Sequence, residues 1–413
     1  MVKVMHLSVH MDSHNHSHQL SGMTEPAEYR QLIKALGRGK KGSRSLTLIE
    51  SYQLVRGFYD NIGTVTQLSV ALMLMRVKGE TAEEVAGTAL ALRSSVDNQW
   101  QQLKVDIDWP CYGAKRDQLP YLLLSAKLLA KNGYRILLHG DNRVLPHRQH
   151  IAGFIEALGI ASVSSASQAQ LALTSSGICY VNADAFTPLV NSFSDIHHDI
   201  GLRSLYQSAI RCINPANARL SLRSYFHPGL DDIHLNVAKL MAKNEQTLLK
   251  TNVAIFKGYQ GECEFNPRSS TAITLLGGED VSQVDLPTQL NALVGSKAKE
   301  EELQARWLTT LWHGEPLAAD SHGNGSSDCN IECNSTHNST ESLRAHSAII
   351  TNVMAVLMLT DFSLGIDSAK TLACEYWTSR NTRCKTQDAI GTFKQHQWLA
   401  AHSEVSNAHT ESI

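Results

Sequence analysis

The sequence has little of several features that would assign a protein class at once. Aromatic residues make up only 6% of the chain, and its eight cysteines contain no C-x-x-C pair. The N-terminal residues show no apolar core followed by a cleavage site. Sparse cysteines without a secretory signal predict free thiols in a reducing cytoplasm, not a disulfide-stapled secreted domain.

The chain also lacks a charge excess and a long hydrophobic run. Its 37 Lys and Arg against 39 Asp and Glu give a net charge of −2, which excludes a chain that is basic throughout but not a local basic patch. The longest apolar stretches, 68–75 and 349–359, are too short or too interrupted to span a bilayer, so we expect no membrane association. With 413 residues, 43% of them hydrophobic, the chain predicts a globular protein of two or three domains.

Residues 25–95 show helical periodicity and no strand pattern. Apolar residues recur at helical spacing over 29–36. Thr47 is placed to cap the next helix, with Glu50 at the capping-box position three residues on. Thr66 and Thr81 are expected to start two further helices. These features predict a small helical domain.

From about residue 100, short runs rich in strand formers alternate with helical stretches. The expected strands cover 105–107, 134–138, 178–182, 219–222, 252–256 and 272–275. The expected helices cover 119–131, 149–158, 233–243 and 287–295, followed by two more within 342–379. This alternation predicts an α/β fold: a small N-terminal helical domain plus a large α/β domain with a mostly parallel central sheet.

Polar segments separate and flank these parts. The expected division is a disordered His-rich tail at 1–23, a helical domain at 24–96, an α/β domain at 97–318 and 342–380, a flexible insertion at 319–341 and a loose tail at 381–413. The tail histidines, and the Cys and His residues of the insertion, invite a metal-binding interpretation. Neither group has a scaffold that would fix a metal's geometry, so we predict no metal site.

Four segments resemble a known family. They are QLSVALMLMRVKGETAEEVAGTALALR (67–93), ICYVNADAFTPL (178–189), GLRSLYQSAIRCINP (201–215) and KGYQGECEFNP (257–267). They are similar to the anthranilate phosphoribosyltransferase family, also called glycosyltransferase family 3. The resemblance extends over about 25–315 and 342–375. It implies a nucleoside phosphorylase or phosphoribosyltransferase-like fold and homodimers formed through the helical domain.

The functional motifs that this resemblance implies are altered. The family's diphosphate loop, G-T-G-G-D, aligns with DWPCYGAKRD (108–117), and its K-H-G-N-R motif aligns with LHGDNRVLPHRQ (138–149). The magnesium-binding D-E pair becomes Cys263 and Glu264, and the arginine that grips anthranilate aligns with His197. The former substrate cleft would comprise Tyr112, Gly113, His139, Gly140, Asn142, His197, Arg203 and Glu264. We therefore predict no catalytic residues and no cofactor, with magnesium only if a transferase activity persists.

The segment LGRGKKGSRSL (36–46) resembles the G-R-G-K segment of the YbiB-type, TrpD-like branch of this family, which implies nucleic-acid binding. Residues 30–44 carry six positive charges and no acidic residue. The candidate nucleic-acid-binding residues are Arg30, Lys34, Arg38, Lys40, Lys41 and Arg44, extended by Lys115, Arg116, Arg143 and Arg148. The alternative interpretation of the segment is a solvated helix end with cations near its C-terminus.

These observations predict a cytoplasmic homodimer that binds nucleic acid through phosphates without strong sequence specificity. DNA is the expected partner, with RNA as a further candidate. Two alternatives remain open at this point: an active glycosyl or phosphoribosyl transferase with a non-anthranilate acceptor, and a purely structural partner-binding protein.

Overall fold

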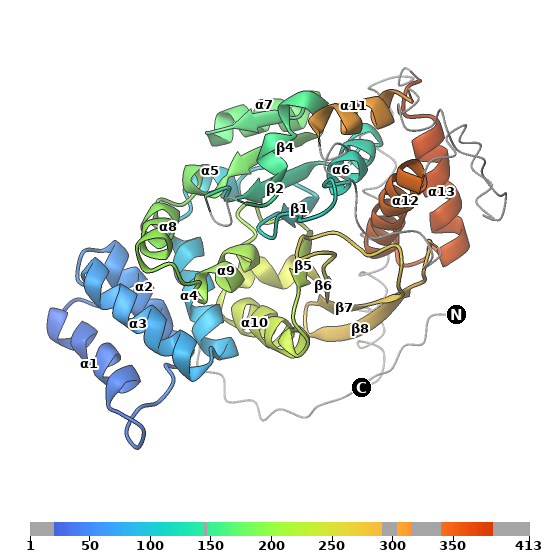
Figure 1. Ribbon diagram of the computed structural model, residues 1–413. Coiled ribbons are helices and arrows are strands. Elements are labelled where there is room, and N and C mark those ends of the chain that lie inside the picture. Colours follow the sequence, from blue (N-terminus) through green and yellow to red (C-terminus); the bar gives the residue numbers. More distant parts are fainter. Residues whose placement is uncertain (1–19, 144–146, 291–303, 315–339, 383–413) are drawn as a thin grey trace, which may run out of the picture.

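The computed structural model describes residues 20–143, 147–290, 304–314 and 340–382 (Figure 1). The expected His-rich tail, the insertion and the C-terminal tail lie wholly or largely outside the described residues. The domain division given above therefore stays a prediction.

The N-terminal part consists of helices. They are α1 (Pro26–Gly37), α2 (Leu48–Tyr59), α3 (Val65–Lys78), α4 (Ala82–Ser94) and the short α5 (Asn98–Gln101). Thr47, Thr64 and Thr81 each cap a helix in a complete capping box, which satisfies backbone N–H groups that the first turn leaves free. The predicted starts at Thr47 and Thr81 are confirmed. The predicted start at Thr66 is wrong, because Thr64 forms the box with Gln67.

One eight-stranded sheet forms the centre of the α/β part, in the order β3-β4-β2-β1-β5-β6-β7-β8. The strands are β1 (Ile107–Pro110), β2 (Ile136–Gly140), β3 (Ala161–Val163), β4 (Ile178–Asn182), β5 (Leu220–Tyr225), β6 (Asn252–Lys257), β7 (Thr271–Gly277) and β8 (Asp280–Leu286). All neighbours pair in parallel except β6–β7 and β7–β8. The predicted fold class, an α/β fold with a mostly parallel sheet, is confirmed.

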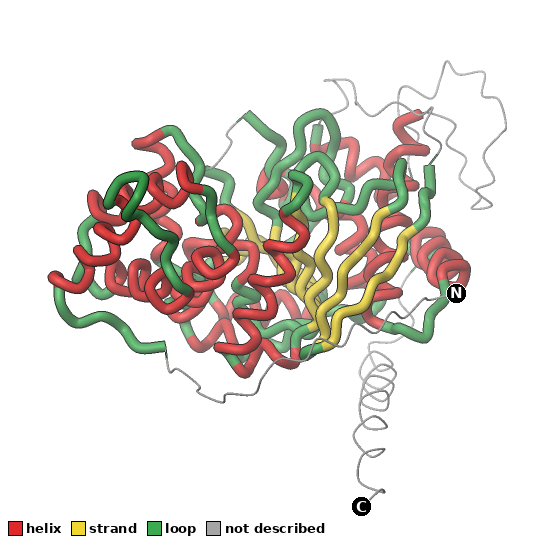
Figure 2. Tube along the Cα trace, turned by 90° about the horizontal axis from the view of Figure 1, so that it is seen from below, coloured by secondary structure: helices red, strands yellow, loops and turns green. Residues whose placement is uncertain are grey.

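Helices cover both faces of this sheet (Figure 2). They are α6 (Leu122–Lys131), α7 (Ala166–Ser175), α8 (Leu189–Ile200), α9 (Tyr206–Ala209), α10 (Leu230–Asn244), α11 (Ala305–His313), α12 (Thr340–Thr360) and α13 (Ile366–Thr378). Side chains from α6, α12 and α13 share one apolar core with one face of the strands. On the opposite face, α7, α8 and α9 share a second core with the helical domain.

Several predicted elements differ from the structure. The expected helix at 149–158 is two 3-10 turns, Ile151–Gly153 and Glu156–Leu158. Residues 287–290 of the expected helix at 287–295 are not helical, and the remainder lies outside the described residues. The strands β3 and β8 and the helices α5, α7, α8, α9 and α11 were not predicted. Both of these strands lie at an edge of the sheet and are largely exposed, so they lack a strong apolar pattern.

Helix α12 is the longest element. Its stretch Ser342–Thr360 is long and apolar enough to cross a membrane by length and composition, but 89% of that window is buried inside the fold. It packs against α6 and α13. Its apolar character is therefore that of a core helix, buried on all sides.

The close packing of α2 against α4 depends on Gly87. A Cβ atom at this position would lie 2.3 Å from the Leu48 carbonyl oxygen and 2.8 Å from the Tyr52 nitrogen, both backbone atoms of α2. We expect Gly87→Ala to lower the free energy of unfolding by about 1–3 kcal/mol, measured by urea denaturation. Gly153→Ala is the matched control, since Gly153 is exposed and a Cβ there meets no atom within 4 Å. Stability of the Gly87 variant equal to wild type would contradict this account of the packing.

Candidate functional site

The candidate site lies at the C-terminal edge of the parallel strands, where open α/β sheets bind ligands. The loop that follows β1 and the segment 258–265, which follows β6, meet at this edge. Gly113 allows the contact, because a Cβ atom there would lie 1.7 Å from the Gly261 carbonyl oxygen. The predicted cleft residue Gly113 is therefore packed against backbone.

The acidic side chain of Glu262 lies inside this contact. Its carboxylate accepts hydrogen bonds from the backbone N–H of Ala114 and of Cys263, both at 2.8 Å, and from that of Gly113 at 3.4 Å. Glu262 is only 1% exposed. Nothing in the sequence distinguished this residue from a surface glutamate, so it was missed above.

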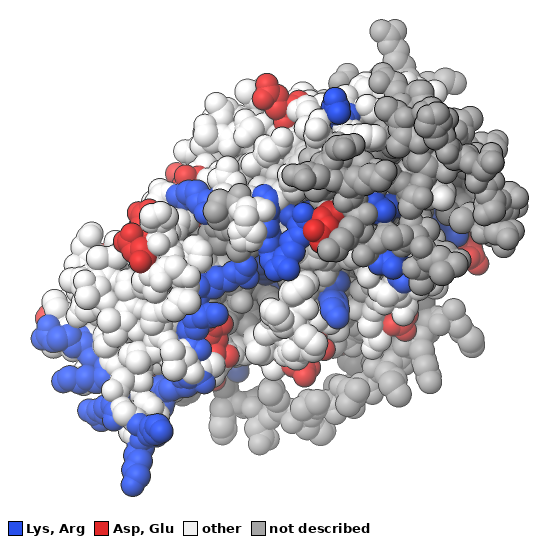
Figure 3. All heavy atoms as spheres, viewed as in Figure 1, with Lys and Arg blue, Asp and Glu red and all other residues white. Residues whose placement is uncertain are grey.

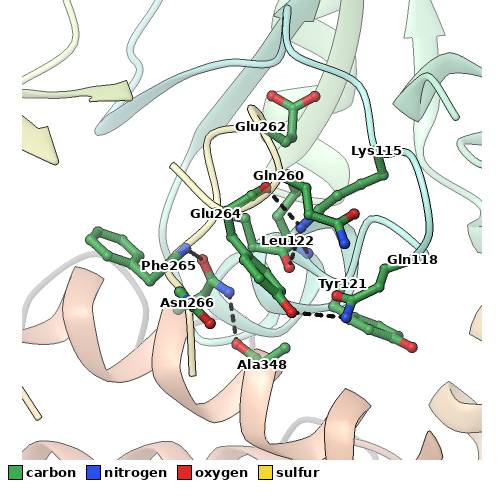
Figure 4. A network of polar contacts seen from close by, with 12 residues as sticks. Lys115, Gln118, Tyr121, Leu122, Gln260, Glu262, Glu264, Phe265, Asn266 and Ala348 are labelled. Carbon is green, nitrogen blue, oxygen red and sulfur yellow. Dashed lines mark hydrogen bonds and ion pairs between the residues drawn. The ribbon is translucent and has the colours of Figure 1, made fainter. Parts of the chain in front are cut away.

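Lys115 and Glu264 form a fully buried ion pair beside this loop (Figure 4). The Lys115 Nζ lies 2.8 Å from Glu264 Oε1 and also donates to the Tyr259 carbonyl oxygen. Glu264 Oε2 accepts from the backbone N–H of Leu122, the first residue of α6. Burial raises the pKa of the Glu264 carboxyl, and the Lys115 charge opposes that shift. The prediction that Lys115 contacts nucleic acid is wrong, because its ammonium is buried and engaged.

The residues aligned with a magnesium-binding pair do not fit the ion. Both oxygens of Glu264 are already engaged. The Cys263 thiol is buried, which raises its pKa well above the ordinary range, and magnesium prefers oxygen ligands. Within the described ranges, no three His, Cys, Asp or Glu residues gather as a metal site.

Tyr112 and His139, both predicted cleft residues, are brought together. The Tyr112 hydroxyl lies 2.8 Å from His139 Nδ1, and His139 Nε2 lies 2.8 Å from Asp108 Oδ1. Ser221 donates to the other Asp108 oxygen at 2.7 Å. Burial raises the pKa of Tyr112 well above its ordinary range. The Tyr112 side chain, which follows β1, and one side chain each from β2, β1 and β5 thus form a linear series of hydrogen-bonded partners.

The remaining predicted cleft residues are spread along the edge. A Cβ atom at Gly140 would lie 2.6 Å from the Cys111 carbonyl oxygen, so this glycine also allows close backbone contact. Asn142 and Arg148 line a pocket of about 490 Å³. The His197 imidazole forms a hydrogen bond through Nδ1 with the Leu202 carbonyl oxygen, at 2.9 Å.

Five arginines gather near the junction of the helical and α/β parts, and we call them the arginine cluster. They are Arg76 of α3, Arg116 after β1, Arg148, Arg203 between α8 and α9, and Arg211 in the 3-10 turn Ile210–Cys212. Burial and then the neighbouring arginines lower the pKa values of Arg148 and Arg203. No ion pair within 4.0 Å joins any of the five to a carboxylate among the described residues. Sequence reasoning missed Arg76 and Arg211 as members.

The predicted basic segment lies at the far end of the helical domain. Arg30, Lys34, Arg38, Lys40 and Lys41 are exposed on α1 and the turn after it, and we call them the α1 patch. Figure 3 shows Lys and Arg side chains gathered at this end, and again as a band between the helical and α/β parts.

Two of the arginines predicted to contact phosphates form ion pairs with carboxylates of the chain. Arg44 forms a bidentate pair with Glu50, at 2.6 and 2.5 Å. The Arg143 guanidinium donates to Asp141 at 2.9 Å, and this partner raises the pKa of Arg143 against the effect of burial. The turn after α1 is also held by backbone hydrogen bonds, including Arg44 N–H to the Ala35 carbonyl oxygen at 2.9 Å. These backbone hydrogen bonds give the turn a defined conformation.

Replacing Lys115 by Met would leave the Glu264 carboxylate buried without its charge partner. We expect Lys115→Met to lower the free energy of unfolding by about 3–5 kcal/mol, measured by denaturant titration. The double variant Lys115→Met, Glu264→Gln should recover much of this loss, because it removes both charges. If the double variant loses as much stability as the sum of the two single variants, the pair is not coupled as described.

Comparisons with known proteins agree with this fold. Residues 30–96 match the helical bundle domain of the glycosyl transferase family. An anthranilate phosphoribosyltransferase of Shouchella clausii is 26% identical over 266 residues, which cover 60% of this chain and 77% of that protein. The Escherichia coli protein YbiB is 25% identical over 300 residues, which cover 70% of this chain and 90% of YbiB.

Among solved structures, the anthranilate phosphoribosyltransferase of Thermus thermophilus superposes with a TM-score of 0.57. The superposition covers 84% of this chain and 95% of that protein at 18% identity, which shows a shared fold. The chain is therefore similar, in its helical domain and in its overall fold, to the anthranilate phosphoribosyltransferases of glycosyltransferase family 3 and to YbiB.

Proposed function

We propose that this protein is a homodimeric nucleic-acid-binding protein that contacts phosphates without strong sequence specificity. The observation that carries the proposal is the arginine cluster, five neighbouring guanidinium groups of which none lies within 4.0 Å of a carboxylate among the described residues. Like charges held together raise the free energy of the unliganded state, and an anionic ligand relieves this repulsion.

The α1 patch supplies a second set of exposed cations. It contributes five positive charges from a 12-residue stretch of α1 and its turn, in a chain whose net charge is −2. Phosphate contacts of this kind position a nucleic acid and carry no sequence information. The α1 patch and the band formed at the domain junction are visible on one face of the molecule (Figure 3), so one extended ligand could reach both.

The alternative is a transferase with a non-anthranilate acceptor. The names of the relatives and the shared fold favour it, since anthranilate phosphoribosyltransferases occur among the similar proteins. The geometry favours the binding protein. Glu264 is bound to Lys115 and Leu122, and the Tyr112 and His139 side chains are bound to one another, so these groups are not free to hold a diphosphate and its metal.

The two functions differ in a direct assay. We expect no release of diphosphate from phosphoribosyl diphosphate above background in the presence of magnesium and anthranilate, because the groups aligned with the family's motifs are engaged internally. The measurement is a coupled diphosphate assay on the full chain, with an active anthranilate phosphoribosyltransferase as control. Turnover that depends on an acceptor would favour the transferase.

Binding through phosphates must weaken with salt. Each neutralised phosphate releases counterions, so log affinity should fall against log salt with a slope of about −0.9 per contact on duplex DNA and about −0.7 on single strands. We expect the joint change of Arg38, Lys40 and Lys41 to Ala to weaken binding to all sequences alike. It should flatten the slope on duplex DNA by up to about three units per engaged patch. Filter binding at several salt concentrations measures both quantities.

The matched control removes three exposed lysines elsewhere, Lys239, Lys243 and Lys250, and changes net charge by the same amount. Its slope should remain that of wild type. A second variant, Arg116→Ala with Arg203→Ala, tests the arginine cluster and should also flatten the slope. If neither cationic region alters a salt-dependent affinity, or if the wild type shows none, the nucleic-acid proposal fails.

A further inference from the structure

At the edge of the sheet, three backbone N–H groups donate hydrogen bonds to a carboxylate of the same chain. The N–H groups of Gly113, Ala114 and Cys263 all point at one carboxylate, that of Glu262. We call these three donors the N–H cradle. Figure 4 shows the Glu262 carboxylate pointing away from the Lys115–Glu264 pair, so it is not a member of that ion pair.

Because Glu262 carries a charge, its burial requires specific hydrogen-bond partners and not only close packing of the loops. A buried carboxylate is costly unless charge-assisted hydrogen bonds replace its water. Here three backbone donors do so, and no lysine, arginine or histidine forms an ion pair with it among the described residues. Arg148 adds a favourable charge from nearby and donates to the Gly113 carbonyl oxygen at 3.0 Å.

The space around the carboxylate is small. Gly113 approaches the Gly261 carbonyl so closely that no Cβ fits between them, and Glu262 is 1% exposed. Converging backbone N–H groups form the type of concave site that binds anions in other proteins. In this protein the bound anion is a side chain.

We infer that Glu262 is a built-in anion: its carboxylate occupies the N–H cradle and closes the loop after β1 to external phosphate or diphosphate. Removing the side chain opens a site for one small carboxylate ion. This inference is independent of the proposed nucleic-acid binding, which uses the arginine cluster and the α1 patch.

Chemical rescue of a truncated side chain tests the inference in the full chain. The variants are Glu262→Ala, which empties the cradle, and Glu262→Gln, which keeps it filled without charge. The probe is sodium formate, exchanged against sodium chloride at constant ionic strength. The readouts are the thermal midpoint and the hydrogen-exchange protection of the peptide 111–117, measured by mass spectrometry.

We expect Glu262→Ala to unfold at a lower temperature than wild type and to lose protection over 111–117. Formate should raise its midpoint saturably, by about 1–4 °C at tenfold excess over the dissociation constant, and restore the protection. Wild type and Glu262→Gln should not respond. A folded Glu262→Ala variant whose midpoint and protection are insensitive to formate would overturn the inference.

One further variant is a control, and Glu262→Gln covers the case in which Glu262→Ala does not fold. Glu84→Ala removes another buried carboxylate that accepts backbone N–H groups, in the helical domain, and formate should leave its protection over 111–117 unchanged. If Glu262→Ala does not fold, Glu262→Gln decides the question by exchange alone. The charge-assisted bonds are weakened there, so 111–117 should exchange faster than in wild type, and equal rates would contradict a built-in anion.

Discussion

The buried ion pair between Lys115 and Glu264 fixes the geometry of the candidate site. Lys115 pairs by backbone hydrogen bonds with Gln149, so the pair connects the loops after β1 and β2 to the segment that carries Glu264. Glu264 also accepts from the first turn of α6, and the adjacent Phe265 N–H donates to Asn352 of α12. Five parts of the α/β fold therefore lie at this pair of charges or directly beside it. A buried pair of this kind gains little net stability, but each charge forces the other to be present and in place.

This constraint divides the charges of the site into an inner and an outer set. The carboxylates of Glu262 and Glu264 are turned inward and satisfied by backbone N–H groups and by one lysine. The neighbouring arginines are exposed or half-buried, and none lies within 4.0 Å of a carboxylate among the residues described. The backbone loops at this edge of the sheet are thus occupied by the chain's own carboxylates. The positive charge of the site lies outside these loops, on the arginines. A surface of this kind suits a long anion that lies across it, such as a nucleic-acid strand, better than a small one enclosed by loops.

Local signals in the sequence predicted local structure well. The capping box of Thr47 and Glu50 was recognised because all its partners lie within four residues. The strand at 178–182 was predicted with its boundaries, since both faces are buried and the run is apolar. The site was harder, because its contacts are nonlocal. Lys115 and Glu264 are separated by 149 residues. A lysine in a polar loop is interpreted as a surface residue unless its buried partner is known.

The same reasoning explains why a family resemblance was more informative about the fold than about the site. A fold requires apolar residues at many positions and tolerates exchange among them, so about 25% identity with relatives is enough to retain it. A catalytic site requires particular groups that are free to meet a ligand. In this chain the aligned groups are present in part, yet Tyr112 is bound to His139 and Glu264 to Lys115, so their hydrogen-bonding capacity is used within the protein. The function of such a chain has to be argued from other groups, and here these are the arginines and lysines that form no ion pair with a carboxylate among the described residues.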